Sequence, residues 1–164
     1  MSGRSDALAE RFEAAVEEFI GVVEPLTDEQ WRTVCPNEER SIGVLARHGA
    51  QFIPFELSYF QAFAAGRQPS MIDRNQLAEW NANHAIEWAQ APQDETLELL
   101  RERAAHAASE VLQMTDEQLA MSGRYTKEIE EPWTVEKWLD RVLIGHVFVH
   151  LQSIRETLAS EGAD

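Results

Sequence analysis

Two histidines lie four residues apart near the C-terminal end of the chain, in the sequence H-V-F-V-H at positions 146 to 150. If this segment is helical, that spacing puts both imidazoles on one face, about 40° apart around the axis. A third histidine, His48, lies in a segment whose apolar residues recur at helical spacing. Neutral imidazole nitrogens bind divalent metals, so His48, His146 and His150 are candidate ligands of one ion.

Buried histidines without a metal are the alternative. A single histidine on an apolar helical face is more often a hydrogen-bonded core residue than a metal ligand. Each imidazole needs partners for two nitrogens, however, and the residues that share these faces are almost entirely apolar. A shared cation would bind one nitrogen from each ring at once. From the residues alone, both interpretations stay open.

The helices that would position these histidines can be delimited by apolar spacing, by Ser and Thr caps and by a glycine stop. We expect helices from after Ser5 to before Pro25, from Ser41 to about Ala65 with Gly66 as the stop, and from Thr134 to about Leu158. A third helical region runs from about Asp73 to Trp88, is broken or bent at A-P-Q-D (91–94), and resumes to about Leu112. Alternation of β-branched residues is scarce, so the fold class is all-α. Long amphipathic helices bury their stripes best side by side, which predicts a four-helix bundle with short extra helical turns in the connections.

The sequence T-D-E-Q occurs twice, at 27–30 and at 115–118. Each copy is typical of a capping box, in which a Thr hydroxyl and a Gln side chain satisfy each other's free backbone amides. Each copy follows a long helix and precedes a loop and a capped helix that carries histidine, with Ser41 and Thr134 as the caps. This order predicts a bundle with two related halves.

Composition narrows the function classes. The chain has 164 residues with 14 Lys and Arg against 29 Asp and Glu, a net charge of −15. Such a field repels phosphate backbones and anionic membrane surfaces, so nucleic-acid and membrane binding are disfavoured. No linker divides the sequence, and we expect one domain over residues 1–164. The single cysteine, Cys35, cannot form an internal disulfide, which fits a cytoplasmic protein.

A pocket wall is predicted in the segment around residues 80–84. Asn81 and His84 interrupt an otherwise apolar helical stripe that also carries Trp80. Together with Tyr59, which shares the face of His48, these residues are interpreted as the wall of a binding pocket that orients a substrate or bonds a ligand histidine. The alternative is a polar pair in the core that ties this helix to its neighbours. No catalytic residue is identified.

Four passages resemble the DinB/YfiT-like superfamily, bacterial four-helix bundles that include mycothiol-dependent maleylpyruvate isomerases and bacillithiol transferases. These passages are S-I-G-V-L-A-R-H at 41–48, W-N-A-N-H at 80–84 with D-E-T-L-E-L-L-R-E-R at 94–103, T-D-E-Q-L at 115–119, and W-T-V-E-K-W-L-D-R-V-L-I-G-H-V-F-V-H at 133–150. The most specific feature is one histidine on the second bundle helix with an H-x-x-x-H pair on the last. The resemblance implies a divalent metal, zinc or nickel, bound by His48, His146 and His150.

The chemistry of such a site follows from its ligands. Three neutral imidazoles leave at least one coordination position open, as in catalytic zinc sites. Zinc proteases place a general-base glutamate directly after the first histidine, where this chain has Val147. This departure favours activation of a thiolate or carbonyl, and the resemblance implies a transferase or isomerase that acts on a small molecule with a low-molecular-weight thiol. A hydrolase with another base and a non-catalytic binding or stress-response module are the alternatives.

Two further features give weaker hypotheses. Cys35 precedes the helix that starts at Ser41, whose dipole would lower the pKa of a nearby thiol, so this cysteine is an alternative nucleophile. Ile144, Phe148 and Leu151 lie opposite the histidine face of the last helix, which makes its centre apolar all round. Such a helix is covered either by bundle neighbours or by a second subunit, and we predict a homodimer.

Overall fold

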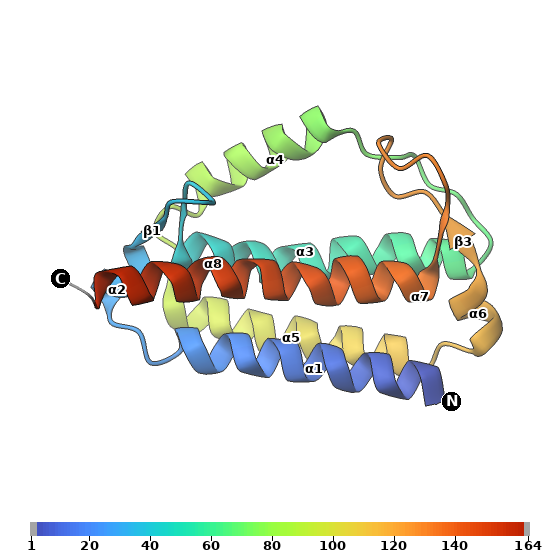
Figure 1. Cartoon of the computed structure of the whole chain (residues 1–164), viewed down its shortest axis with the longest axis horizontal. Coiled ribbons are helices and arrows are strands. Elements are labelled where there is room, and N and C mark those ends of the chain that lie inside the picture. Colours follow the sequence, from blue (N-terminus) through green and yellow to red (C-terminus); the bar gives the residue numbers. More distant parts are fainter. Residues whose placement is uncertain (1–2, 163–164) are drawn as a thin grey trace.

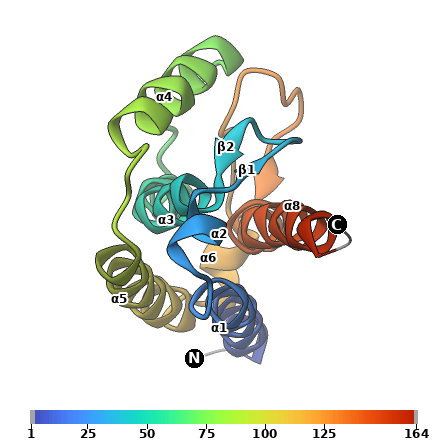
Figure 2. The same cartoon turned by 90° about the vertical axis from the view of Figure 1, so that its left-hand side faces the viewer.

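The computed structural model describes residues 3–162, in which four long helices run side by side (Figure 1). They are α1 (Gly3–Val23), α3 (Ile42–Ala64), α5 (Gln93–Leu112) and a C-terminal helix built from α7 (Val135–Trp138), η1 (Leu139–Ile144) and α8 (Gly145–Glu161). Seen end on, these helices surround a common core (Figure 2). The predicted all-α four-helix bundle is confirmed. Within the described residues, no helix has both the length and the hydropathy that a membrane span requires.

Helix α3, which carries His48, begins and ends where its capping residues predict. The Ser41 hydroxyl accepts a hydrogen bond from the Val44 amide at 3.3 Å. At the other end Gly66 has a φ of +71°, a conformation that glycine adopts without steric cost. The Gly66 and Arg67 amides donate to carbonyls in the last turn of α3, both at 2.8 Å. This paired arrangement is the Schellman motif, and it satisfies carbonyls that would otherwise lack partners.

Short elements repeat in the same order in the two halves of the chain. The helices α2 (Asp28–Arg32) and α6 (Asp116–Ala120) each start at a complete capping box, with Thr27 and Thr115 as the caps. Antiparallel strand pairs follow, β1 (Val34–Cys35) with β2 (Arg40–Ser41) and β3 (Ser122–Gly123) with β4 (Trp133–Thr134). The predicted order of elements is confirmed, whereas the strand pairs lie in segments that we expected to be loops.

Helix α4 (Arg74–Glu87) is not a member of the bundle. It lies along the outer side of α3, apart from the other helices (Figures 1 and 2). His84 is its only buried residue, while Trp80 and Ile86 are exposed. Its start is fixed by a capping box between Asp73 and Gln76. The helix therefore covers the histidine-bearing part of α3 without adding to the core.

The C-terminal helix differs from a regular α-helix at η1, where six residues form a π-helical segment. This segment accommodates extra backbone in the helix and shifts the register of everything that follows it. Ile144 and Leu151 are buried in the core of this chain, whereas Phe148 and Val149 remain exposed. Two of the three residues on which the homodimer prediction rests are thus covered by bundle neighbours.

Candidate metal centre

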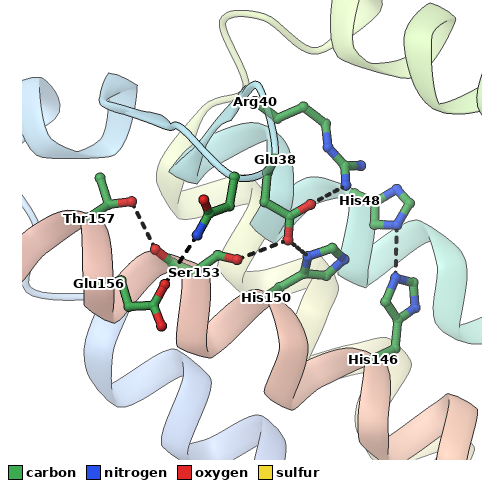
Figure 3. Close-up of polar contacts among 9 residues, drawn as sticks. Glu38, Arg40, His48, His146, His150, Ser153, Glu156 and Thr157 are labelled. Atoms are coloured by element: carbon green, nitrogen blue, oxygen red, sulfur yellow. Dashed lines mark hydrogen bonds and ion pairs between the residues drawn. The ribbon is translucent and has the colours of Figure 1, made fainter.

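His48, His146 and His150 meet in space although they come from α3 and α8. One ring nitrogen from each residue lies within 4.8 Å of the others. The Nε2 atoms of His48 and His146 are 3.2 Å apart (Figure 3). Two nitrogens bound to one ion at about 2.0–2.1 Å are separated by about 3.0–3.4 Å, so this spacing suits a shared cation. It also suits a hydrogen bond between the rings, and the carboxylate partners of Nδ1 in His146 and His150 favour the cation.

Buried carboxylates hold the other nitrogens of the C-terminal histidine pair. Nδ1 of His146 lies 3.0 Å from Glu56 Oε1, and Nδ1 of His150 lies 2.8 Å from Glu38 Oε1. A carboxylate accepts a hydrogen bond from Nδ1–H, and this tautomer leaves the lone pair of Nε2 free for a metal. Nε2 of His150 is buried and has no hydrogen-bond partner among residues 3–162. A buried acceptor without a partner fits a metal ligand, so the residues present suit a divalent metal.

The Glu38 carboxylate is itself held from three sides (Figure 3). Its Oε1 accepts hydrogen bonds from His150 and from the Ser153 hydroxyl, and its Oε2 lies 2.8 Å from Arg40 Nη2. The bond from His150 is the main reason that the pKa of Glu38 falls to about 2, and Arg40 acts in the same direction. Glu38 is therefore ionised at neutral pH and fixes the orientation of the His150 ring.

Burial favours the neutral form of two of the histidine rings, His48 and His150. His48 is 1% exposed, and burial lowers its pKa far below the usual range, with His146 and His150 adding to the effect. Burial also lowers the pKa of His150, although the bond to Glu38 opposes this shift. In His150 desolvation exceeds the opposing effect of Glu38, because the charged imidazolium loses more hydration than the carboxylate restores. Unprotonated imidazoles are the form that binds metals.

Two of the predicted wall residues, Trp80 and His84, lie beside His48. Their ring centroids are each 5.6 Å from that of His48, and the two rings stack on each other at 5.1 Å. Nε2 of His84 lies 2.6 Å from Gln51 Oε1, a bond that ties α4 to α3. Burial lowers the pKa of His84 to about 4. The two residues form a wall next to the metal ligands.

The other two predicted wall residues, Tyr59 and Asn81, are placed differently. Tyr59 donates a hydrogen bond to the Ser70 carbonyl at 3.0 Å and lines a separate hollow of about 270 Å³ that Phe52 and Trp80 also line. Phe52 stacks on His48 with a centroid distance of 4.7 Å, so this hollow adjoins the histidines through one ring. The side-chain oxygen of Asn81 is buried and has no hydrogen-bond partner in the described part of the chain.

Three site residues were missed by sequence reasoning, and one expectation was wrong. Glu38, Glu56 and Gln51 were not predicted, yet each bonds a histidine ring. Glu56 had a detectable signal, because it is the only acidic residue in α3. Cys35 is fully buried, and desolvation raises the pKa of its thiol, so the expected lowering by the helix dipole is wrong. An inaccessible neutral thiol is not an activated nucleophile.

Similarity to known proteins agrees with this fold. The family model of the DinB superfamily matches residues 11–154. YfiT from Bacillus subtilis, described as a probable metal-dependent hydrolase with an unusual four-helix bundle topology, has a TM-score of 0.81 at 20% identity, covering 99% of this chain and 90% of that one. An uncharacterised protein from Clostridium difficile 630 has a TM-score of 0.73 at 15% identity, covering 95% of this chain and 96% of that one. A sibling lethal factor precursor, DfsB, has a TM-score of 0.74 at 15% identity, covering 98% of both chains. No curated protein matches significantly. At these identities the likeness shows the fold alone.

Proposed function

Because the chain belongs to the DinB superfamily, we propose that it is a metal-dependent enzyme whose divalent cation, zinc or nickel, is bound by His48, His146 and His150. The observation that carries this proposal is the pair of carboxylate-bonded imidazoles, His146 with Glu56 and His150 with Glu38, beside His48. A histidine that donates Nδ1–H to a carboxylate is typical of metal ligands, since the bond fixes both tautomer and ring orientation. Nitrogen ligands suit zinc and nickel well.

The chemistry depends on the ion and on the residues around it. With three neutral ligands and an open position, a bound dication supplies Lewis-acid chemistry that lowers the pKa of a thiol or polarises a carbonyl. Glu38 and Glu56 hold the ligand rings in place. Phe52 and Trp80 pack against His48 and limit the access of water from their side. This shell of rings favours a reactant that brings its own nucleophile.

We propose transfer or isomerisation of a small-molecule substrate with a low-molecular-weight thiol as the reaction class. The only cysteine, Cys35, is buried, so the thiol must come from outside the chain. Both carboxylate oxygens of Glu38 are bonded, to His150, Ser153 and Arg40, which leaves Glu38 without a free oxygen for deprotonating water. These two facts support thiolate chemistry over hydrolysis. Such thiols are abundant in the cytoplasm, where we expect the protein to work.

Hydrolysis is the second candidate function. It is favoured by the similarity in fold to YfiT, which is described as a probable metal-dependent hydrolase. A hydrolase would need no thiol, and its rate would not depend on one.

Elemental analysis of the untagged protein tests the ligand set. We expect about one equivalent of zinc or nickel per chain, because three nitrogens of one site bind a single ion. His146→Ala and His150→Ala should abolish this stoichiometry. His106→Ala is the matched control, since His106 is exposed on α5, and it should retain the metal. Stoichiometric metal in His150→Ala would exclude the proposed site.

Turnover assays separate the reaction classes. The metal-loaded protein is incubated with a panel of electrophiles and several low-molecular-weight thiols, and in parallel with esters and amides without thiol. Thiol-dependent turnover that disappears in His150→Ala supports the transferase or isomerase. Thiol-independent hydrolysis with the same mutational response would establish the hydrolase instead. Metal binding without turnover in either assay would favour a binding module.

A further inference from the structure

A second hollow, distinct from the histidine cluster, carries two arginines without ion-pair partners. It is a groove of about 630 Å³ between α3, α4 and α5, and Arg47 of α3 and Arg103 of α5 both line it. Neither guanidinium has a carboxylate within 4.0 Å in residues 3–162, whereas Arg101, on the same helix as Arg103, pairs with Glu24. The groove thus holds two of the 14 basic side chains of a chain that has 29 acidic ones. Their shared field favours an anion between them.

Arg47 is held in a fixed orientation. Its guanidinium carbon lies 3.7 Å from the centroid of the Trp88 ring, and its Nε is buried without a hydrogen-bond partner in the described chain. Stacking on an aromatic face fixes the plane of a guanidinium and leaves the N–H groups in that plane available as hydrogen-bond donors. Leaving a charged donor partly desolvated and unpaired is costly, and an incoming carboxylate would offset that cost.

The groove adjoins the candidate metal centre. Its wall includes Trp80 and His84, whose rings each lie 5.6 Å from the ring of His48. His84 is 4% exposed and is fixed by its bond to Gln51. A molecule whose anionic end lies between the arginines is therefore separated from His48 by the rings of Trp80 and His84.

We infer that this groove binds the carboxylate of a small organic substrate. The inference rests on the proposed function in one respect, namely that the bound molecule reacts at the metal. A carboxylate matches the planar donor fork of a guanidinium, and the amide of Asn83 offers a further donor. Glu87 also lines the groove, at an exposed position. Its charge opposes an anionic ligand and attracts a cationic one, so this residue discriminates between the two.

The test uses metal-free protein labelled with 15N and follows the indole N–H signals during titration with succinate, its neutral diamide succinamide, or inorganic phosphate. Succinate should shift the signals of Trp80 and Trp88. The signal of Trp138 should stay in place, because its N–H bonds to the Gly123 carbonyl in the core. Succinamide should cause no shift, and phosphate should bind more weakly than succinate.

Matched variants identify the groups responsible. Arg47→Met and Arg103→Met should each weaken succinate binding by about tenfold or more, because each removes a charge-assisted contact. Arg101→Met removes the same charge from the same helix outside the groove and should leave the affinity unchanged. Glu87→Gln should tighten binding. The unshifted Trp138 signal reports that each variant is folded.

Several results would overturn the inference. Equal binding of succinamide or phosphate, an equal loss of affinity in Arg101→Met, or weaker succinate binding in Glu87→Gln would each show that the groove is not a carboxylate site. Succinate binding that requires added zinc and disappears in His146→Ala would place the carboxylate on the metal instead. If the protein binds no metal yet binds succinate through Arg47 and Arg103, the proposed function fails while the carboxylate site stands.

Discussion

The Glu38 carboxylate lies 2.8 Å from Nδ1 of His150, although 112 positions separate the two residues in sequence. Glu38 reaches this place because the short hairpin of β1 and β2 turns back over α8, with Glu39 in the left-handed region at a φ of +54°. Arg40 and Ser153 then fix the carboxylate from its other sides. The hairpin is therefore part of the candidate site, and under the proposed function Glu38 is a positioning residue that acts through His150.

Replacing this carboxylate should weaken metal binding without abolishing it. Glu38→Gln keeps the size of the side chain but removes the charge that fixes the His150 tautomer, and the expected loss of zinc affinity is about 10–100-fold. Competition with a chromophoric chelator measures this change. Glu39→Gln, at the exposed neighbouring position, is the control and should bind zinc normally. Equal affinities in Glu38→Gln and the wild type would show that the contact has no role in binding.

Metal should stabilise the folded protein. An ion that binds only the native state at a hundred times its dissociation constant adds about 2.7 kcal/mol. For a chain of this size that gain raises the melting temperature by about 5–10 °C. Thermal denaturation with and without zinc, followed by circular dichroism, measures the shift, and a chelator should reverse it. In His146→Ala the difference between the two conditions should vanish, and a persistent shift there would mean that zinc stabilises through another site.

The bundle could be predicted because its signals are local. Thr27, Ser41 and Thr134 mark helix starts through hydrogen bonds within one turn, and Gly66 marks an end through its own conformation. The pairing of His146 with His150 is equally local, since four residues span one turn of a helix. The approach of His48 to this pair depends on how two helices pack, and the family resemblance rather than the spacing pointed to it.

The rest of the site could not be predicted because it depends on long-range folding. Glu38 is one of two adjacent glutamates in a polar loop, and nothing in its neighbourhood distinguishes the carboxylate that folds back onto α8. Glu56 is different, because a lone acid within an apolar helical stretch must be paired if it is buried. The π-helical segment has no glycine or proline to indicate it, since it spans L-D-R-V-L-I.

Cys35 should be inert while the protein is folded. Its thiol is fully buried, and burial raises its pKa, so the reactive thiolate is scarce and inaccessible. We expect a disulfide reagent that reports free thiols to modify native protein at least about a hundredfold more slowly than denatured protein, because access requires opening of the fold. Cys35→Ala should retain thiol-dependent turnover. Fast labelling of native protein together with loss of turnover in Cys35→Ala would restore this cysteine as a nucleophile.

The π-helical segment η1 absorbs one extra residue between the two halves of the C-terminal helix. Trp138 before it and Leu151 after it are both 1% exposed, so both flanks are anchored in the core. Deleting Arg141, whose side chain is 70% exposed, would remove the extra residue and let a regular helix join the two flanks in their present orientation. The core residues and the two histidines would then keep their places.

We therefore expect the deletion of Arg141 to leave zinc binding unchanged and the free energy of unfolding within about 1 kcal/mol of the wild-type value, because no core side chain is displaced. Urea denaturation and competition with a chromophoric chelator measure the two quantities. Arg141→Ala, which keeps the π-helical segment, is the control and should change stability by less than about 0.5 kcal/mol. A loss of about 3–5 kcal/mol in the deletion variant, together with loss of zinc, would mean that the two flanks are not related as in a regular helix.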